Sequence, residues 1–148
     1  MTHVPVLLAL GSNLGNRQEN IKKACALLAS GVTIEKISSL RETRPLGVED
    51  QPDFINGALY GKTGLTPREL LCFIKETEKS CGRYETYRWG PRVIDIDIIF
   101  YDNIFYRSEE LVIPHRELKN RDFVTVPALE VIPQNNDLIW KGYITGTA

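Results

Sequence analysis

The sequence lacks a net charge of either sign. Its 148 residues include 18 Lys and Arg and 19 Asp and Glu, so the formal net charge at pH 7 is −1. A protein that coats nucleic acid or an anionic membrane usually carries a clear basic excess, because neutralising phosphates supplies much of the affinity. The balance therefore argues against both kinds of partner. Any phosphate-binding site must come from a local cluster of Arg and Lys.

The sequence also lacks long apolar runs and paired cysteines. No apolar stretch approaches the ~18 residues of a membrane span, and no basic segment followed by an apolar one marks a signal peptide. The three cysteines, Cys25, Cys72 and Cys81, have no CxxC spacing, so a disulfide framework is not expected. There is no internal repeat or low-complexity segment. We therefore expect a monomeric cytoplasmic protein whose single domain spans residues 1–148.

Hydrophobic patterning predicts an alternation of strands and helices. Asn16 followed by Glu19 resembles a capping box, and Thr66, Pro67 and Glu69 mark a second helix start more strongly. Gly31 and Gly82 are the expected helix ends. The predicted strands cover 4–10, 33–43 (bulged), 54–60 and 93–101, and the predicted helices cover 17–29 and 67–81. The order β-α-β-β-α-β is typical of a ferredoxin-like α+β sandwich with an antiparallel sheet.

The remaining segments carry weaker signals. Residues 44–52 contain Pro and Gly and predict a loop. Asp102 and Asn103 predict a turn that returns residues 104–106 as a hairpin partner of strand 93–101. Extra short helices are expected near 115–120 and 123–129, and the tail after Pro133 has no specific signal.

Two aspartates stand out in the strand at 93–101. Its period of two places Asp95 and Asp97 on one face, about 7 Å apart, and the intervening isoleucines on the other. Two carboxylates with open positions suit Mg²⁺, which keeps waters and substrate phosphates as its other ligands. Surface aspartates on a solvated strand face have the same pattern, so D-x-D alone leaves both readings open.

The segment just before this strand favours the metal reading. Arg88-Trp89-Gly90-Pro91-Arg92 brings two guanidinium groups and an aromatic ring close to the acidic pair. Guanidinium forks match phosphate oxygens, and arginines together with a metal are the usual electrostatic apparatus of phosphoryl transfer. A salt-bridged structural loop would use the same residue types.

Several other residues are weaker candidates. Glu78 lies on the apolar stripe near a helix C-terminus, where the helix dipole disfavours a carboxylate; it is a candidate for ligand recognition, or a side chain that reaches water or a nearby lysine. His115 lacks a partner at zinc-ligand spacing and fits a hydrogen bond to phosphate or ribose, or a structural role. Phe54 shares a strand face with Asn56, whose amide can both donate and accept along the edge of a heterocycle.

The segment 11–17, which joins the first strand to the first helix, resembles a phosphate-binding loop. Its spacing matches neither G-x-x-x-x-G-K-[ST] nor G-x-G-x-x-G. A tight turn followed by a helix cap explains its glycines and Asn16.

Taken together, the motifs resemble the 6-hydroxymethyl-7,8-dihydropterin pyrophosphokinase family over nearly the whole chain. The stretch R-W-G-P-R-V-I-D-I-D at 88–97 is the most specific. The other matching segments are A-L-G-S-N-L-G at 9–15, T-R-P-L-G at 43–47, D-Q-P-D-F-I-N at 50–56, Gly82-Arg83, Pro114-His115 and K-N-R-D-F at 119–123.

This resemblance implies transfer of the pyrophosphoryl group of ATP to the hydroxymethyl oxygen of the pterin, with release of AMP and with two Mg²⁺ ions. Asp95 and Asp97 resemble the metal ligands, and Arg83 and Arg92 the catalytic guanidinium groups. The positions that resemble the ATP site are Arg88, Trp89, Arg92, Ile98, His115 and Arg121.

The resemblance also implies a pterin site. Phe54 and Phe123 resemble an aromatic pair that sandwiches the pterin ring, and Asn56 resembles the residue that reads its edge. The other positions implied at the pterin site are Thr43, Pro45, Leu46 and Glu78.

Two other functions use similar residues. A nucleotidyltransferase also combines paired carboxylates with two Mg²⁺ ions, but releases pyrophosphate. A ferredoxin-like module that binds single-stranded nucleic acid would need a basic face, on which Asp95 and Asp97 would repel phosphates.

Overall fold

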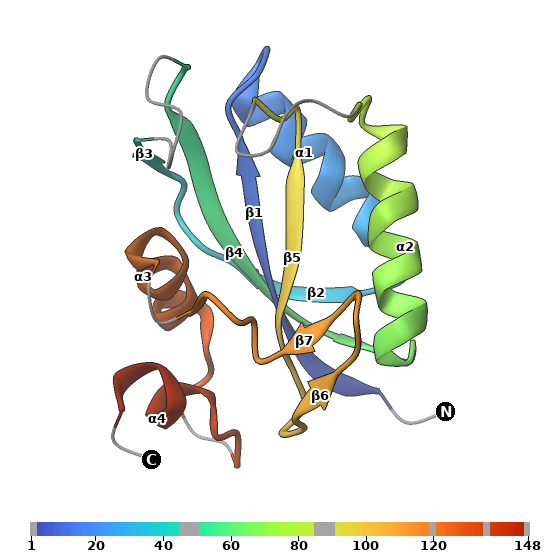
Figure 1. Ribbon diagram of the computed structural model, residues 1–148, viewed down its shortest axis with the longest axis vertical. Coiled ribbons are helices and arrows are strands. Elements are labelled where there is room, and N and C mark those ends of the chain that lie inside the picture. Colours follow the sequence, from blue (N-terminus) through green and yellow to red (C-terminus); the bar gives the residue numbers. More distant parts are fainter. Residues whose placement is uncertain (1–2, 45–50, 85–90, 119–120, 135–136, 147–148) are drawn as a thin grey trace.

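Five strands form one antiparallel sheet in the order β2-β4-β1-β5, with β3 also pairing with β4 (Figure 1). The computed structural model describes residues 3–44, 51–84, 91–118, 121–134 and 137–146. The strands are β1 (Val4–Ser12), β2 (Thr33–Ile37), β3 (Arg41–Thr43), β4 (Phe54–Thr63) and β5 (Asp95–Tyr101). In this order β5 is an edge strand, which leaves one of its sides free for contacts from other elements.

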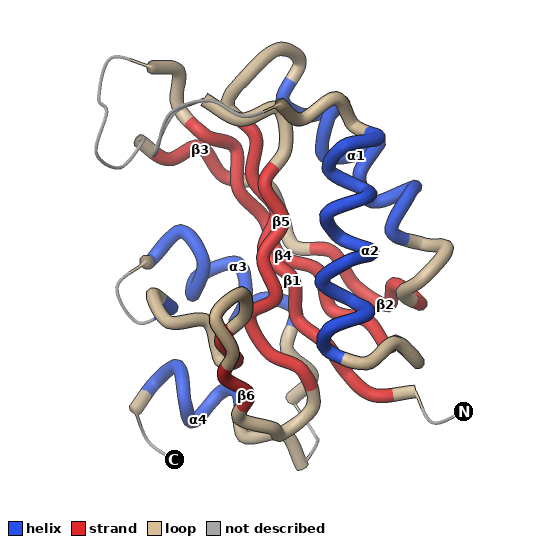
Figure 2. Tube along the Cα trace, turned by 45° about the vertical axis from the view of Figure 1, so that its right-hand side comes forward, coloured by secondary structure: helices blue, strands red, loops and turns tan. Residues whose placement is uncertain are grey.

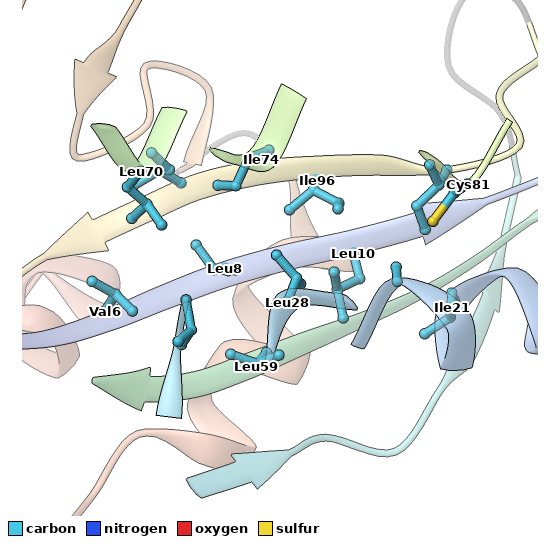
Figure 3. Close-up of a cluster of buried hydrophobic side chains, with 14 of the residues drawn as sticks. Val6, Leu8, Leu10, Ile21, Leu28, Leu59, Leu70, Ile74, Cys81 and Ile96 are labelled. Carbon is cyan, nitrogen blue, oxygen red and sulfur yellow. The ribbon is translucent and has the colours of Figure 1, made fainter. Parts of the chain in front are cut away.

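Two helices cover one face of the sheet, which confirms the predicted βαββαβ arrangement. They are α1 (Arg17–Leu28) and α2 (Pro67–Ser80). The capping box of α2 is complete: Thr66 and Glu69 each accept a hydrogen bond from the other's backbone N–H. The apolar faces of α1 and α2 pack against Leu8, Leu10 and Ile96 of the sheet in the larger of two buried cores (Figure 3).

Helix α1 ends earlier than its pattern predicted. Its C-cap is Ala29, two residues before Gly31. A Cβ at position 31 would lie 2.7 Å from the Phe73 ring of α2. Gly31 therefore leaves room for the Phe73 ring, and the C-cap position itself falls on Ala29.

The predicted bulged strand at 33–43 is two strands, β2 and β3, that pair with different halves of β4. Between them, Ser38 replaces a regular backbone pair. Its N–H donates to the Ala58 carbonyl and its Oγ accepts from the Ala58 N–H. Between β2 and β3, the Ser38 hydroxyl oxygen thus takes the place of a backbone carbonyl as acceptor. A sequence pattern does not reveal such a replacement.

The opposite face of the sheet carries two further helices, α3 (Asp122–Val131) and α4 (Trp140–Thr145) (Figure 2). A bulge in β5 supplies part of their core, because Leu8 faces Ile98 whereas Leu7 faces Phe100. Phe100 then stacks on Trp140 with the two rings 5.2 Å apart. α3 confirms the helix expected near 123–129, whereas α4 had no sequence prediction.

The predicted hairpin after β5 is wrong. β6 (Tyr106–Arg107) pairs with β7 (Val112–Ile113) and not with β5. The Asn103 side chain instead donates to the Asp137 carbonyl and accepts from the Ile139 N–H. The turn at 102–103 therefore docks the segment before α4. Of the helix expected near 115–120, residues 115–118 form a short turn and 119–120 lie outside the described residues.

Within the described ranges, no helix is both long enough and apolar enough to cross a membrane. All three cysteines are free thiols.

Trp140 should be the residue that holds α4 on the sheet. It is fully buried, and its indole Nε1 donates to the Asp102 carbonyl over 2.7 Å. We expect Trp140→Ala to lower the free energy of unfolding by about 3 to 5 kcal/mol, measured by urea denaturation, because it creates a cavity and leaves a carbonyl unpaired. Leu129→Ala, on the exposed side of α3, should cost less than about 1 kcal/mol. Equal losses in the two variants would contradict this role.

Candidate active site

The aspartates of β5 point away from the α1 and α2 core, as the strand period predicted. Ile94, Ile96 and Ile98 are buried in that core, whereas the side chains of Asp95 and Asp97 keep 39% and 36% of their surface exposed. The two carboxylates therefore occupy the opposite face at the edge of the sheet, held by a strand whose other face is anchored.

Three paired residues, Asp95, Gly11 and Asn56, form a row across one face of the sheet, from the edge towards its middle. We call this row the floor. Asp95 pairs with Gly11 of β1, and Gly11 pairs with Asn56 of β4. A Cβ at Gly11 would lie 2.8 Å from Asn56 Oδ1 and 3.5 Å from the Phe54 ring. Gly11 is buried, and the absence of a Cβ leaves room for the Asn56 amide and the Phe54 ring on the face of the sheet that also carries Asp95, about 10 Å from Asn56. Sequence reasoning assigned Gly11 only to a turn, because its strand pairing is set by distant residues.

Asn56 is oriented at the far end of this floor. Its Nδ2 donates to Thr43 Oγ1 of β3, and its side chain is buried. Phe54 lies two residues earlier on the same face of β4, beside Gly11. The predicted pterin-site residues Thr43, Phe54 and Asn56 are therefore neighbours, whereas Pro45 and Leu46 lie outside the described residues.

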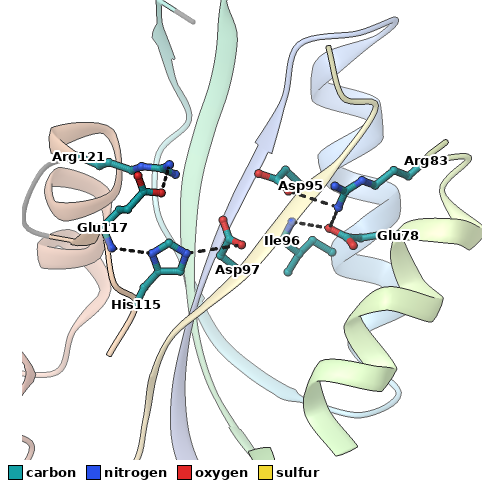
Figure 4. A network of polar contacts seen from close by, with 8 residues as sticks. All are labelled: Glu78, Arg83, Asp95, Ile96, Asp97, His115, Glu117 and Arg121. Atoms are coloured by element: carbon teal, nitrogen blue, oxygen red, sulfur yellow. Dashed lines mark hydrogen bonds and ion pairs between the residues drawn. The ribbon is translucent and has the colours of Figure 1, made fainter. Parts of the chain in front are cut away.

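Glu78 and Arg83 form a buried ion pair next to Asp95 (Figure 4). Arg83 Nη1 lies 2.6 Å from Glu78 Oε2 and 3.4 Å from Asp95 Oδ1. Glu78 Oε2 also accepts the Ile96 N–H at the free edge of β5. Burial raises the pKa of Glu78, and the Ile96 N–H and Arg83 oppose that rise. These contacts explain why a carboxylate lies on the apolar stripe of α2, because Glu78 fixes Arg83 against β5. Glu78 was predicted at the pterin site, but β5 lies two strands away from β4, which carries Asn56.

Asp97 faces a second set of polar residues. Its Oδ1 lies 3.9 Å from His115 Nε2, and His115 Nδ1 accepts the Glu117 N–H. Burial, followed by the Arg121 charge, lowers the pKa of His115, which favours a neutral ring. Because Nδ1 accepts a hydrogen bond, that neutral ring carries its proton on Nε2, towards Asp97.

Arg121 is held by Glu117, with which it forms an ion pair four residues away. Its guanidinium lies 5.5 Å from the centre of the Phe123 ring. Sequence reasoning missed Glu117, although its i,i+4 spacing from Arg121 was an available signal.

The like charges at the site cost stability. Burial and then the neighbouring Asp95 carboxylate raise the pKa of Asp97 to about 8.

In the described residues no group of three or more His, Cys, Asp or Glu could hold a metal ion. The donor set is therefore unlike a zinc site, and two hard carboxylates match an ion such as Mg²⁺ that takes its remaining ligands from water and phosphate.

Two buried guanidinium nitrogens lack a hydrogen-bond partner among the described residues. Arg83 Nε and Arg92 Nη1 are buried and make no hydrogen bond within the described part of the chain. A buried unpaired donor is costly, and a bound anion would satisfy it. Arg88 and Trp89, the other predicted members of this loop, lie outside the described residues.

A cleft of about 430 Å³ opens along the free edge of β5. It brings together five of the residues that were predicted to contact the nucleotide or the metals: Arg83, Asp95, Asp97, Ile98 and His115. Leu71 and Ile74 of α2 and Val112 of β7 supply apolar walls. Such a cleft can accept an apolar ring along its walls and an anionic group near the arginines.

The fold and this site point to a class of protein: a ferredoxin-like sheet that transfers a phosphate-containing group. The family model described as 7,8-dihydro-6-hydroxymethylpterin-pyrophosphokinase (HPPK) matches residues 7–133. The chain belongs to this family.

Curated relatives agree with that assignment. The chain is 47% identical over 128 residues to a protein of Aquifex aeolicus named 2-amino-4-hydroxy-6-hydroxymethyldihydropteridine pyrophosphokinase, which covers 86% of this chain and 80% of the relative. It is 42% identical to the Bacillus subtilis protein of the same name, covering 86% and 77%. It also matches 24% of the length of a mitochondrial folate synthesis bifunctional protein of Arabidopsis thaliana, at 42% identity.

A solved structure agrees on the fold. The chain of Plasmodium falciparum HPPK-DHPS with pteroate superposes with a TM-score of 0.70 over 97% of this chain and 43% of that one, at 16% identity.

Asp97→Asn should make the metal-free protein more stable at high pH. The pKa of Asp97 in the fold lies above its ordinary value of 3.8, so the folded protein binds the proton more tightly than the unfolded chain. The free energy of unfolding must then fall as pH rises from about 4 to about 8. We expect a gain of about 1 to 3 kcal/mol at pH 8, reduced by solvent screening of the partly exposed side chain, and almost none at pH 4.

Thermal or urea unfolding in EDTA at the two pH values measures this difference. Asp137→Asn, which removes an exposed carboxylate before α4, is the matched control for losing one negative charge. A wild-type protein as stable as Asp97→Asn at pH 8 would show that the aspartate pair is not strained.

Proposed function

We propose that the cleft and floor beside Asp95 and Asp97 are where this chain performs the reaction of its family. In that reaction the pyrophosphoryl group of ATP passes to 6-hydroxymethyl-7,8-dihydropterin in folate biosynthesis, and AMP is released. The hydroxymethyl oxygen forms a bond to the β-phosphorus, the bond from that phosphorus to the α,β-bridging oxygen breaks, and the hydroxyl loses its proton. One observation carries the assignment: Asp95 stands where the β5 cleft meets the Gly11 floor that leads to Asn56.

Carboxylates outnumber cationic side chains in the lining of the cleft, so triphosphate binding there would depend on guanidinium groups together with metal ions. Arg83 lines the cleft, Arg83 and Arg92 each carry a buried nitrogen without a hydrogen-bond partner in the described residues, and Arg121 and His115 lie on the other side of Asp97. Phosphoryl transfer requires little from protein groups beyond positioning and charge stabilisation, which fixed guanidinium groups supply. Ile98 lines the same cleft and would contact the base or ribose.

Asp95 and Asp97 would hold the metal. When bound, two Mg²⁺ ions would offset the charge of the phosphates and so reduce their repulsion of the incoming oxygen. The aspartate pair suits this task because Asp97 is held close to Asp95 despite the cost in charge repulsion. Glu78 supports the arrangement by fixing Arg83 at the edge of β5.

The pterin would lie on the floor over Gly11. Asn56 would read its edge, with Thr43 holding the amide in place, and Phe54 would contact one face of the ring. Phe123, at the start of α3, would supply the other aromatic face. In this pose the hydroxymethyl group points from Asn56 towards Asp95.

We also propose a single-domain, monomeric, cytoplasmic enzyme. The cores on the two faces share one sheet, which supports one domain. Three free thiols, including the exposed Cys72, fit a reducing compartment. The large exposed apolar side chains of the described residues come from separate segments, such as Ile37 in β2 and Phe105 before β6, and this separation supports a monomer.

Product analysis tests the reaction. With ATP, Mg²⁺ and the hydroxymethyl dihydropterin, we expect AMP and the pterin diphosphate. EDTA should abolish product, and added Mg²⁺ should restore it. Asp97→Asn should form AMP more than about 100-fold more slowly although its fold is stable, because it loses a metal ligand. ADP would indicate an ordinary kinase instead, and pyrophosphate a nucleotidyltransferase.

Asn56 tests the pterin pose. We expect Asn56→Ala to raise the KM for the pterin by about 10- to 100-fold through loss of one or two buried hydrogen bonds, with the KM for ATP changed less than about twofold. Thr43→Val, which removes only the oxygen that orients the amide, should give a smaller rise in the same constant. A larger effect of Asn56→Ala on ATP than on pterin would place the pterin elsewhere.

A further inference from the structure

Asn13 is a buried side chain that lies between the two halves of the site. It follows β1 directly, only 1% of its surface is exposed, and all of its side-chain hydrogen-bonding atoms are engaged with other segments of the chain. The sequence suggested no role for it beyond a turn.

One end of the Asn13 side chain binds the segment that leads into β4. Its Nδ2 donates to Gln51 Oε1 over 2.7 Å and to the Pro52 carbonyl over 3.0 Å. Gln51 is itself buried. These residues directly precede Phe54 and Asn56, so the amide nitrogen anchors the chain at the pterin side of the floor.

The other end of Asn13 binds the segment that leads into β5. Its Oδ1 accepts the Arg92 N–H over 2.7 Å, and its backbone N–H donates to the Arg92 carbonyl over 3.0 Å. Arg92 is therefore held at both of its backbone polar groups by one residue. Its guanidinium retains the buried unpaired Nη1 that we assign to phosphate.

We infer that Asn13 is a positioning residue that couples pterin binding to nucleotide binding. This inference rests on the proposed function. A movement of residues 51–52 that follows pterin binding changes the Asn13 amide, and that amide also sets the backbone of Arg92. The two ligands then bind more tightly together than apart, since each selects the same arrangement of the amide.

A purely structural role would have a different signature. Asn20 provides the comparison, because it stabilises the same turn from inside α1: its Nδ2 donates to Ser12 Oγ and to the Leu14 carbonyl. Among the described residues, the Asn20 side chain makes no hydrogen bond to either segment that Asn13 joins. Loss of Asn20 should weaken the turn without separating the two halves of the site.

The experiment measures the dissociation constant of the hydroxymethyl dihydropterin by titration calorimetry, with and without Mg²⁺ and α,β-methylene-ATP, in the full chain. We expect the nucleotide analogue to tighten wild-type pterin binding on the order of tenfold. In Asn13→Ala this ratio should fall to about one. Asn20→Ala should keep the wild-type ratio even where its melting temperature falls as far as that of Asn13→Ala.

Three results would overturn the inference: a wild-type ratio of one, an unchanged ratio in Asn13→Ala, or an equal fall in Asn20→Ala. A wild-type protein that neither binds the pterin nor forms AMP would instead overturn the proposed function, and this inference with it.

Discussion

The site depends on one constraint, which is that β5 must bury one face completely while it presents two carboxylates on the other. Ile94, Ile96 and Ile98 pack under α1 and α2, and the period of the strand then leaves Asp95 and Asp97 no other direction. Their mutual repulsion opposes folding, and the apolar burial on the opposite face outweighs it. Core packing thus holds two like charges at a fixed separation.

Local sequence patterns predicted much of the fold around β5. The helix starts at Asn16 and Thr66 and the alternation in β5 depend on neighbouring residues, so the sequence sufficed to predict them. The break at Ser38 and the docking of Asn103 on the segment before α4 depend on partners far along the chain, and no window of sequence contains them. The same limit explains why Gly31 was misread as a cap.

The residues of the candidate site also fall into those that the sequence could predict and those that it could not. Residue chemistry and family resemblance indicated Asp95, Asp97 and His115, which the structure brings into one cleft. The residues that orient the site were harder to find, because their importance comes from pairing: Glu117 holds Arg121, and Gly11 matters only as the neighbour of Asn56. Glu78 was noticed for its awkward place on the helix, and its partners became apparent only when α2 was seen against the edge of β5.

The same contact of Glu78 has a consequence for the protein's behaviour among its copies. An edge strand presents backbone donors and acceptors that a strand of another molecule can add to, which is a common route to aggregation. The Glu78 carboxylate already accepts the outward N–H of Ile96, and a charged, buried acceptor cannot easily be displaced by a neutral carbonyl. At this point the edge beside the cleft is closed to strand addition, so the protein can keep an open side of its sheet without offering it to another chain.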